Sequence, residues 1–199
     1  GTCGPKAVLG TLWYFQKRCG VKRLIQQCRM RRDGGSILAG LALALKRNGL
    51  SVTLYTVPFT SLCPRHRRIF EEAIRLQVPI RPALTFLEMM SRIDAEHISI
   101  VGYMLDCMSR PNDGFHISPL IGAEGRVVSL PYTVMNYTYT KRAFDCVWHY
   151  PGMHRQCLIV SDLPDLVTEP YRVPKWLQKA IARSKKLATK KVRNRAPGR

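Results

Sequence analysis

Residues 5–16 constrain the fold most strongly, because they are apolar around most of a helical circumference. Pro5 suits the first helical position, and the apolar residues 7–9 and 12–15 follow it. Such a helix has to be covered by other elements on most of its sides. The sequence therefore predicts a buried central helix near the start of a compact domain.

The remaining patterns place helices first and strands later, which predicts an α+β fold. Further helices are expected over residues 21–28, 37–47, 64–76, 85–93 and 140–149. Ser36 is expected to cap the helix over residues 37–47, and Thr140 the helix over residues 140–149. Strands are expected over residues 50–57, 98–105, 115–121, 126–130 and 157–160. The glycine-containing turn at residues 122–125 makes residues 115–121 and 126–130 an antiparallel hairpin.

The composition changes after Pro170, so the chain divides into a domain of residues 1–170 and a basic C-terminal extension of residues 171–199. Trp176 and Leu177 are expected to dock a short helix, residues 174–187, on that domain. With 199 residues, 46% of them hydrophobic, the chain is long enough to bury a core. No run of eighteen apolar residues occurs, so no membrane span is expected.

The formal charge of +19 lies entirely at the two ends of the chain. Residues 1–32 hold eight Lys/Arg and residues 172–199 hold eleven, without any Asp or Glu, whereas the stretch between them is neutral. Such ends attract RNA or a ribonucleoprotein through phosphate neutralisation and counterion release. The candidate nucleic-acid-binding residues are Lys175, Lys179, Arg183, Lys185, Lys186, Lys190, Lys191, Arg193 and Arg195.

Seven cysteines are spread singly through apolar segments, which favours a reducing compartment over a disulfide framework. Residues 1–6 have no basic and apolar regions of a secretory signal. An intracellular location is therefore expected, in the cytoplasm or in an organelle matrix such as that of the mitochondrion.

Cys3 opens the first helix, and this position favours reactivity. A thiol at a helix N-terminus faces unpaired N–H groups and the positive end of the helix dipole, which stabilise the attacking thiolate. Taken alone, Cys-Gly-Pro is weak evidence and more often marks a small buried thiol at a helix start. The later motifs decide between these two interpretations.

The sequence resembles the papain-like cysteine peptidases that process bacteriocins at double-glycine sites. The similarity covers residues 1–161 and includes Thr2-Cys3-Gly4-Pro5, the apolar residues 12–15, Asp33-Gly34-Gly35-Ser36 and residues 41–52. Residues 116–122 and 125–128 match the base histidine, the glycine turn and the returning strand of that family. The order and spacing of these motifs carry the resemblance.

The resemblance implies a papain-like fold and a peptide substrate, with Cys3 as nucleophile and His116 as base. In that family an Asp before a proline orients the histidine, whereas Leu130 precedes Pro131 here, and the family's oxyanion Gln would lie upstream of Gly1. The alternative is a degenerate, non-catalytic papain fold that acts as a structural component of an RNA-rich assembly, such as a ribosome or its assembly particle.

The ligand types of Cys146, His149, His154 and Cys157 suit tetrahedral zinc, although the gap between the two histidines is short for a zinc finger. Buried thiols and surface imidazoles explain the same residues, because Cys146 is expected in a helix and Cys157 in a core strand. No metal site and no cofactor are therefore expected.

Overall fold

The computed structural model describes residues 2–30, 35–104, 115–123, 126–129, 137–148, 155–163 and 171–193. The helices are α1 (Cys3–Tyr14), α2 (Val21–Gln27), α3 (Leu38–Arg47), α4 (Pro64–Arg75), α5 (Phe86–Met90), α6 (Lys141–Trp148) and α7 (Lys175–Arg193). The strands are β1 (Ser51–Thr56), β2 (Ile80–Pro82), β3 (His97–Met104), β4 (Phe115–Ala123), β5 (Arg126–Ser129), β6 (Tyr137–Thr140) and β7 (Cys157–Ser161).

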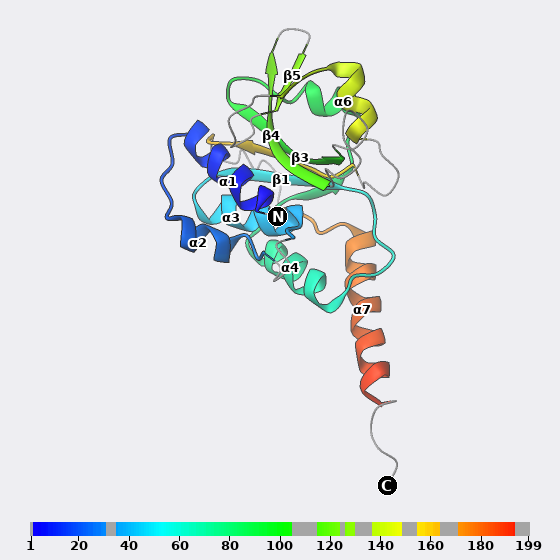
Figure 1. The fold of residues 1–199 in the computed structure, drawn as a ribbon. Coiled ribbons are helices and arrows are strands. Elements are labelled where there is room, and N and C mark those ends of the chain that lie inside the picture. Colours follow the sequence, from blue (N-terminus) through cyan, green and yellow to red (C-terminus); the bar gives the residue numbers. More distant parts are fainter. Residues whose placement is uncertain are drawn as a thin grey trace.

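The strands form one seven-stranded sheet in the order β2-β1-β7-β3-β4-β5-β6. The β1–β2 pair is parallel, and every other neighbouring pair is antiparallel. β7 comes late in the chain but lies between β1 and β3, so the last strand of the domain closes the middle of the sheet. Figure 1 shows α1, α3 and α4 beside this sheet and α6 near β4 and β5.

Each face of the sheet has its own hydrophobic core, because side chains alternate along every strand. On one face, Val52, Leu158 and Ile117 pack with the buried residues of α1, α3 and α4. On the other face, Tyr103 and Leu120 pack with Phe86, Phe144 and Trp148 of α5 and α6. The protein is therefore an α+β molecule, as its sequence predicts, and helices lie on both faces of its sheet.

The central helix of the molecule is α3. All residues from Leu38 to Leu45 are buried, whereas Trp13 at the end of α1 is 58% exposed. The prediction of a buried helix over residues 5–16 agrees with α1 as far as Leu12, since most of its residues are buried against β4, α2 and α3, but it is wrong for Trp13 and Tyr14, which are exposed. A Cβ on Gly40 would lie 2.6 Å from the carbonyl oxygen of Cys28, so glycine lets α3 approach the end of α2 closely.

Most predicted elements agree with the structure to within a few residues, and the cap at Thr140 is confirmed by its bond from the N–H of Ala143 (3.2 Å). The cap at Ser36 is wrong, because Ile37 occupies the N-cap position of α3 and no side chain caps it. The short strands β2 and β6 are not predicted from the sequence. Both lie at edges of the sheet, where the pairing partner decides the structure.

The C-terminal helix α7 is longer than predicted, and its first half is anchored to the domain. Leu177, Ala180 and Ser184 are buried against the domain, and the N–H of Leu62 donates to Ser184 Oγ at 2.8 Å. Beyond this region α7 projects away from the sheet and the other helices (Figure 1). Among the helices described, none has the length and apolar character needed to cross a membrane.

Candidate functional site

Cys3 is the first residue of α1, two residues earlier than the predicted start at Pro5. The helix closes with a bond from the N–H of Lys6 to the carbonyl oxygen of Thr2 (3.1 Å), and the Thr2 side chain makes no capping bond. The first N–H groups of the helix have no acceptor within the helix. Cys3 is half-buried and packs against the core, so its thiol lies at an uncapped, positively polarised helix end.

Gly4 lets the start of α1 lie directly against the segment before α3. A Cβ on Gly4 would lie 2.7 Å from Cβ of Ser36 and 3.2 Å from Leu41 Cδ2. Any larger residue at position 4 would therefore displace the N-terminus of α1 and move Cys3. Ser36 fills this contact and does not cap α3; its buried hydroxyl has no hydrogen-bond partner in the part of the chain that is described.

His116 lies at the second position of β4 and is half-buried. Its cross-strand neighbour is Tyr103 of β3, whose ring meets the imidazole edge-to-face with centroids 5.6 Å apart. Burial lowers the pKa of His116, and the nearby positive charge of Lys6 lowers it further. Both effects disfavour the imidazolium form, so His116 is held as a neutral base at neutral pH.

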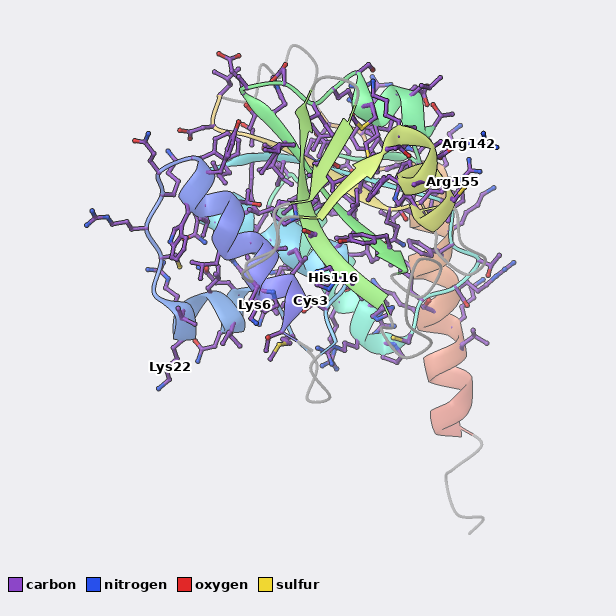
Figure 2. The ribbon with its side chains drawn as sticks, turned by 45° about the horizontal axis from the view of Figure 1, so that its top comes forward. Cys3, Lys6, Lys22, His116, Arg142 and Arg155 are labelled. Atoms are coloured by element: carbon purple, nitrogen blue, oxygen red, sulfur yellow. The ribbon has the colours of Figure 1, made fainter. Side chains whose placement is uncertain are left out.

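Helix α1 packs against β4, and Figure 2 shows the start of α1 close to the start of that strand. A Cβ on Gly10 would lie 3.8 Å from Pro119, and Lys6 is close enough to influence His116. Moving back from Gly10 to Cys3 covers about 10 Å of helix, and moving back from Pro119 to His116 covers about 10 Å of strand. The start of α1, which carries Cys3, and the start of β4, which carries His116, therefore lie at the same end of the contact between the two elements.

The imidazole nevertheless does not face the thiol. Pro119 faces α1, and a residue three positions away on a strand points to the opposite face, where His116 meets Tyr103. No hydrogen bond joins Cys3 to His116 in the structure as described, and none links His116 to a carboxylate among those residues. Leu130 and Pro131, at the position of the family's orienting Asp, lie outside the described residues.

Replacing Lys6 by glutamine is expected to raise the pKa of His116, because one of the two causes of its depression is removed. The pKa should stay below the ordinary value, since burial remains. The measurement is an NMR pH titration of the His116 ring proton. Because the folded form binds this proton less readily than the unfolded chain, acidification through about pH 6.5 should also destabilise the wild type more than Lys6→Gln.

Lys22→Gln provides the matched control, because it removes an equal charge from α2, away from His116 (Figure 2). Its His116 titration should coincide with that of the wild type. Equal shifts in the two variants would show that net charge, and not the position of Lys6, determines the effect.

Among the other cysteines described, Cys19 is half-buried like Cys3, whereas the rest differ from it in burial. Burial raises the pKa of both Cys28 and Cys157 to about 12, so these thiols stay protonated. Cys63 and Cys146 are exposed, and all the cysteines described are free thiols. Cys146 lies on the surface of α6 and Cys157 in the core; His149 and His154 lie outside the described residues. Within the residues described, no group of His, Cys, Asp or Glu could hold a metal ion.

The predicted nucleic-acid residues fall on α7. Lys175, Lys179, Arg183 and Lys186 are exposed and recur at three-to-four spacing, so they form one stripe along the helix. Lys185 points elsewhere and pairs with Glu71 of α4 at 3.1 Å. The side chains of Lys190, Lys191 and Arg193, and the whole of Arg195, lie outside the description.

Comparison with solved structures identifies the fold. A double-glycine motif protease from an AMS/PCAT transporter, solved in complex with its leader peptide, matches with a TM-score of 0.52 and 14% identity, covering 80% of this chain and 84% of its own. The fold is that of a double-glycine peptidase, a papain-like fold. The peptidase domain of Streptococcus ComA, a bifunctional ABC transporter involved in quorum sensing, gives a TM-score of 0.49 and 11% identity, covering 81% and 92% of the two chains. No protein-family model and no curated protein matches the sequence.

The double-glycine peptidase fold confirms the resemblance inferred from the motifs, and it confirms the predicted fold class. It does not by itself assign chemistry to Cys3 and His116, because function depends on the site and not on the fold. Sequence reasoning did not foresee the part played by Tyr103 and Lys6. Their proximity to His116 depends on the β3–β4 register and on the packing of α1, which motifs do not reveal.

Proposed function

We propose that the protein is a thiol hydrolase that cleaves peptide bonds through Cys3 and His116. The observation that carries the proposal is the half-buried thiol at the uncapped N-terminus of α1, within a double-glycine peptidase fold. The N–H groups at the positive end of the helix stabilise negative charge that develops during the reaction, and the N–H of Cys3 can donate to the oxyanion. The solved neighbour binds a leader peptide, which supports a peptide as the substrate class.

In this mechanism His116 accepts the thiol proton while Cys3 Sγ attacks the carbonyl carbon of the peptide bond. The imidazolium then gives its proton to the leaving amine, and water hydrolyses the resulting thioester. The lowered pKa of His116 suits the first step, because the base is neutral before the reaction. The mechanism requires the start of β4 to turn the imidazole from Tyr103 toward Cys3 before the thiol reacts.

Alkylation of Cys3 by iodoacetamide tests the pairing directly. The exposed Cys63 and Cys146, together with Cys19 and Cys107, are first replaced by serine, whereas Cys28 and Cys157 are protected by their high pKa values. Cys3 should react at least about tenfold faster than in the His116→Ala variant, because the base generates the thiolate.

His97→Ala is the matched control, since His97 pairs with Asp94 at 2.9 Å and lies in a different part of the sheet. Its labelling rate should equal that of the parent protein. If Cys3 reacts at one rate in all three proteins, the Cys3–His116 pair is not functional and the hydrolase proposal fails.

The second candidate is a non-catalytic component of an RNA-rich assembly, and the cationic stripe of α7 favours it. The stripe lies on the helix face away from the docked residues Leu177 and Ala180. Beside it, Phe59 and Trp176 line a hollow of about 440 Å³ together with Lys179 and Lys186. Aromatic rings next to cations suit a nucleotide, with the base on a ring and the phosphate on a lysine.

For this candidate, single-stranded RNA should bind with strong salt dependence. Replacing Lys175, Lys179, Arg183 and Lys186 by glutamine should reduce the slope of log K against log salt by about three, since each lost phosphate contact contributes roughly 0.7. The control changes Arg81, Lys141, Arg142 and Arg155, which are exposed elsewhere, and so has the same net charge. Filter binding over a salt series measures the slope for both variants. An equal reduction of the slope in the two proteins would exclude the stripe as the binding surface.

A further inference from the structure

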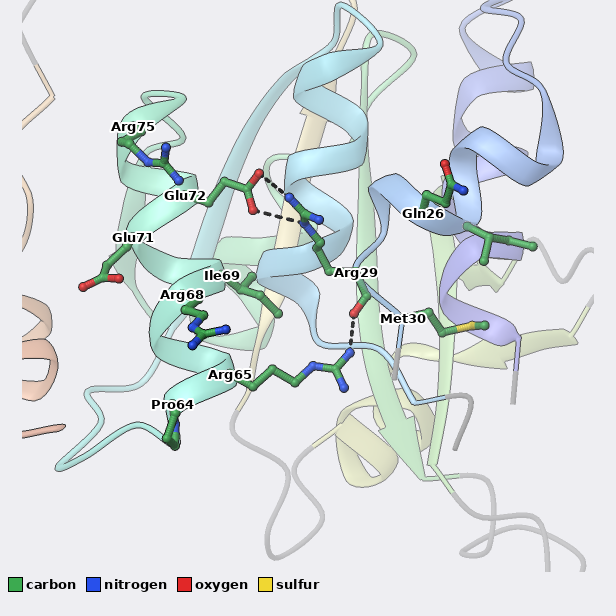
Figure 3. Close-up of a pocket in the computed structure, with 11 residues that line it drawn as sticks. Gln26, Arg29, Met30, Pro64, Arg65, Arg68, Ile69, Glu71, Glu72 and Arg75 are labelled. Atoms are coloured by element: carbon green, nitrogen blue, oxygen red, sulfur yellow. Dashed lines mark hydrogen bonds and ion pairs between the residues drawn. The ribbon is translucent and has the colours of Figure 1, made fainter. Parts of the chain in front are cut away.

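A groove lies between the end of α2 and the exposed side of α4, and its volume is about 960 Å³ (Figure 3). Its apolar surface comes from Ile25, Met30 and Ile69. Its charged surface comes mainly from α4, where Arg65, Arg68, Glu72 and Arg75 recur at three-to-four spacing on one side of the helix. The groove is therefore an apolar trough edged by guanidinium groups.

The two carboxylates of the groove already have partners. Glu72 accepts bonds from Nε and Nη2 of Arg29, at 3.1 and 2.7 Å, and a further bond from Arg47. Burial acts to raise the pKa of Glu72, but these arginines outweigh it and lower the pKa. Glu71 pairs with Lys185. The Arg29–Glu72 pair is thus an example, within the groove itself, of a carboxylate bound by two N–H groups of one arginine.

Arg68 and Arg75 line the same groove, and neither has a hydrogen bond or ion pair with any residue that the structure describes. They lie seven residues apart on α4, so their backbone positions are about 10 Å apart along the helix. Arg65 is partly occupied, since its Nη2 donates to the carbonyl oxygen of Arg29 at 2.6 Å. Two guanidinium groups therefore remain for a ligand.

We infer that this groove binds an acidic peptide segment, with one carboxylate on Arg68, another on Arg75 and an apolar side chain over Ile25 and Ile69. Glutamates four residues apart in an extended peptide lie on one face and span about 13 Å, a distance that the long side chains of Arg68 and Arg75 can bridge. The residue midway between the two glutamates lies on the same face, so its apolar side chain meets Ile25 and Ile69. A nucleic acid fits less well, because its phosphates repeat continuously and Glu71 would repel some of them. The apolar trough also offers nothing to a phosphate backbone.

The site goes beyond the proposed hydrolase, and it does not depend on chemistry at Cys3. It is nevertheless close to α1, because Arg29 packs near Gly40 of α3 and the next residue, Leu41, packs near Gly4. The binding test uses the full chain with Cys3→Ala, so that its outcome is separate from that of the labelling experiment.

The probe is a fluorescein-labelled peptide containing Glu-Ser-Leu-Ser-Glu, and fluorescence anisotropy measures its affinity. The double variant Arg68→Gln/Arg75→Gln should bind it about tenfold more weakly, as expected for the loss of two partly exposed ion pairs. Arg68→Lys/Arg75→Lys should lose less, because the charge is kept and the planar fork is lost. The control Arg142→Gln/Arg155→Gln, which removes two cations on the α6 side (Figure 2), should bind like the parent.

Two results would overturn the inference. One is equal affinity for a peptide in which glutamines replace the glutamates. The other is a single-stranded RNA that depends on Arg68 and Arg75 more strongly than the peptide does. Circular dichroism of each variant confirms the fold, which should not change, because the structure gives these two side chains no internal hydrogen bonds among its described residues.

Discussion

A Cys3→Ala variant is expected to lose peptide cleavage by at least about a thousandfold while keeping its fold. The thiol supplies the attacking atom in the proposed mechanism, and removing a nucleophile from such a pair costs most of the catalysis. Alanine at the first position of α1 leaves the helix intact, because the bond from the N–H of Lys6 to Thr2 does not involve the thiol. Mass spectrometry of a peptide library, incubated with each protein, measures the new termini.

Cys63→Ala is the control for this prediction, since Cys63 is exposed and lies at the start of α4. Its cleavage products should match those of the wild type. A library that remains uncleaved by the wild type, or is cleaved equally by Cys3→Ala, would remove the hydrolase from consideration and leave the non-catalytic candidate.

Leu43→Ala is expected to reduce the free energy of unfolding by about 2–5 kcal/mol. Leu43 is completely buried at the middle of α3, which contacts α1, α2, α4, β1 and β7. Because elements on several sides fix the surrounding side chains, the cavity left by the substitution cannot collapse easily. Urea unfolding monitored by circular dichroism measures the change, provided that the slope with denaturant stays constant.

Leu87→Ala makes the same chemical change at a side chain that is 75% exposed on α5, and it should alter the free energy of unfolding by less than about 0.5 kcal/mol. Equal effects of the two substitutions would contradict the central position of α3. The comparison separates core packing from helix propensity, because leucine and alanine are both strong helix formers.

The sequence predicts the long elements well where periodicity and caps agree. In α4, Pro64 begins the helix and Ile69, Phe70 and Ala73 form its buried face, as their spacing indicates. The hairpin of β4 and β5 follows directly from its glycine turn. Both are local features, because the residues that determine them are close together in the sequence.

Prediction failed where contacts distant in sequence decide the structure. Ser36 looks like a cap, but the approach of Gly4 makes it a packing residue instead. The short β2 becomes a strand because its residues pair with Leu54 to Thr56 of β1. Propensity gives little information at such places, since the partner supplies the stabilisation.

The sequence by itself determined the fold class, the thiol at a helix start, and the concentration of positive charge at the ends of the chain, because composition and periodicity encode these features locally. Only the tertiary structure decided that α3 is the central helix, that His116 faces Tyr103, and that Arg68 and Arg75 edge a groove without partners among the described residues. Register and helix packing join residues that are far apart in the chain, and no local pattern specifies which side chains will then meet.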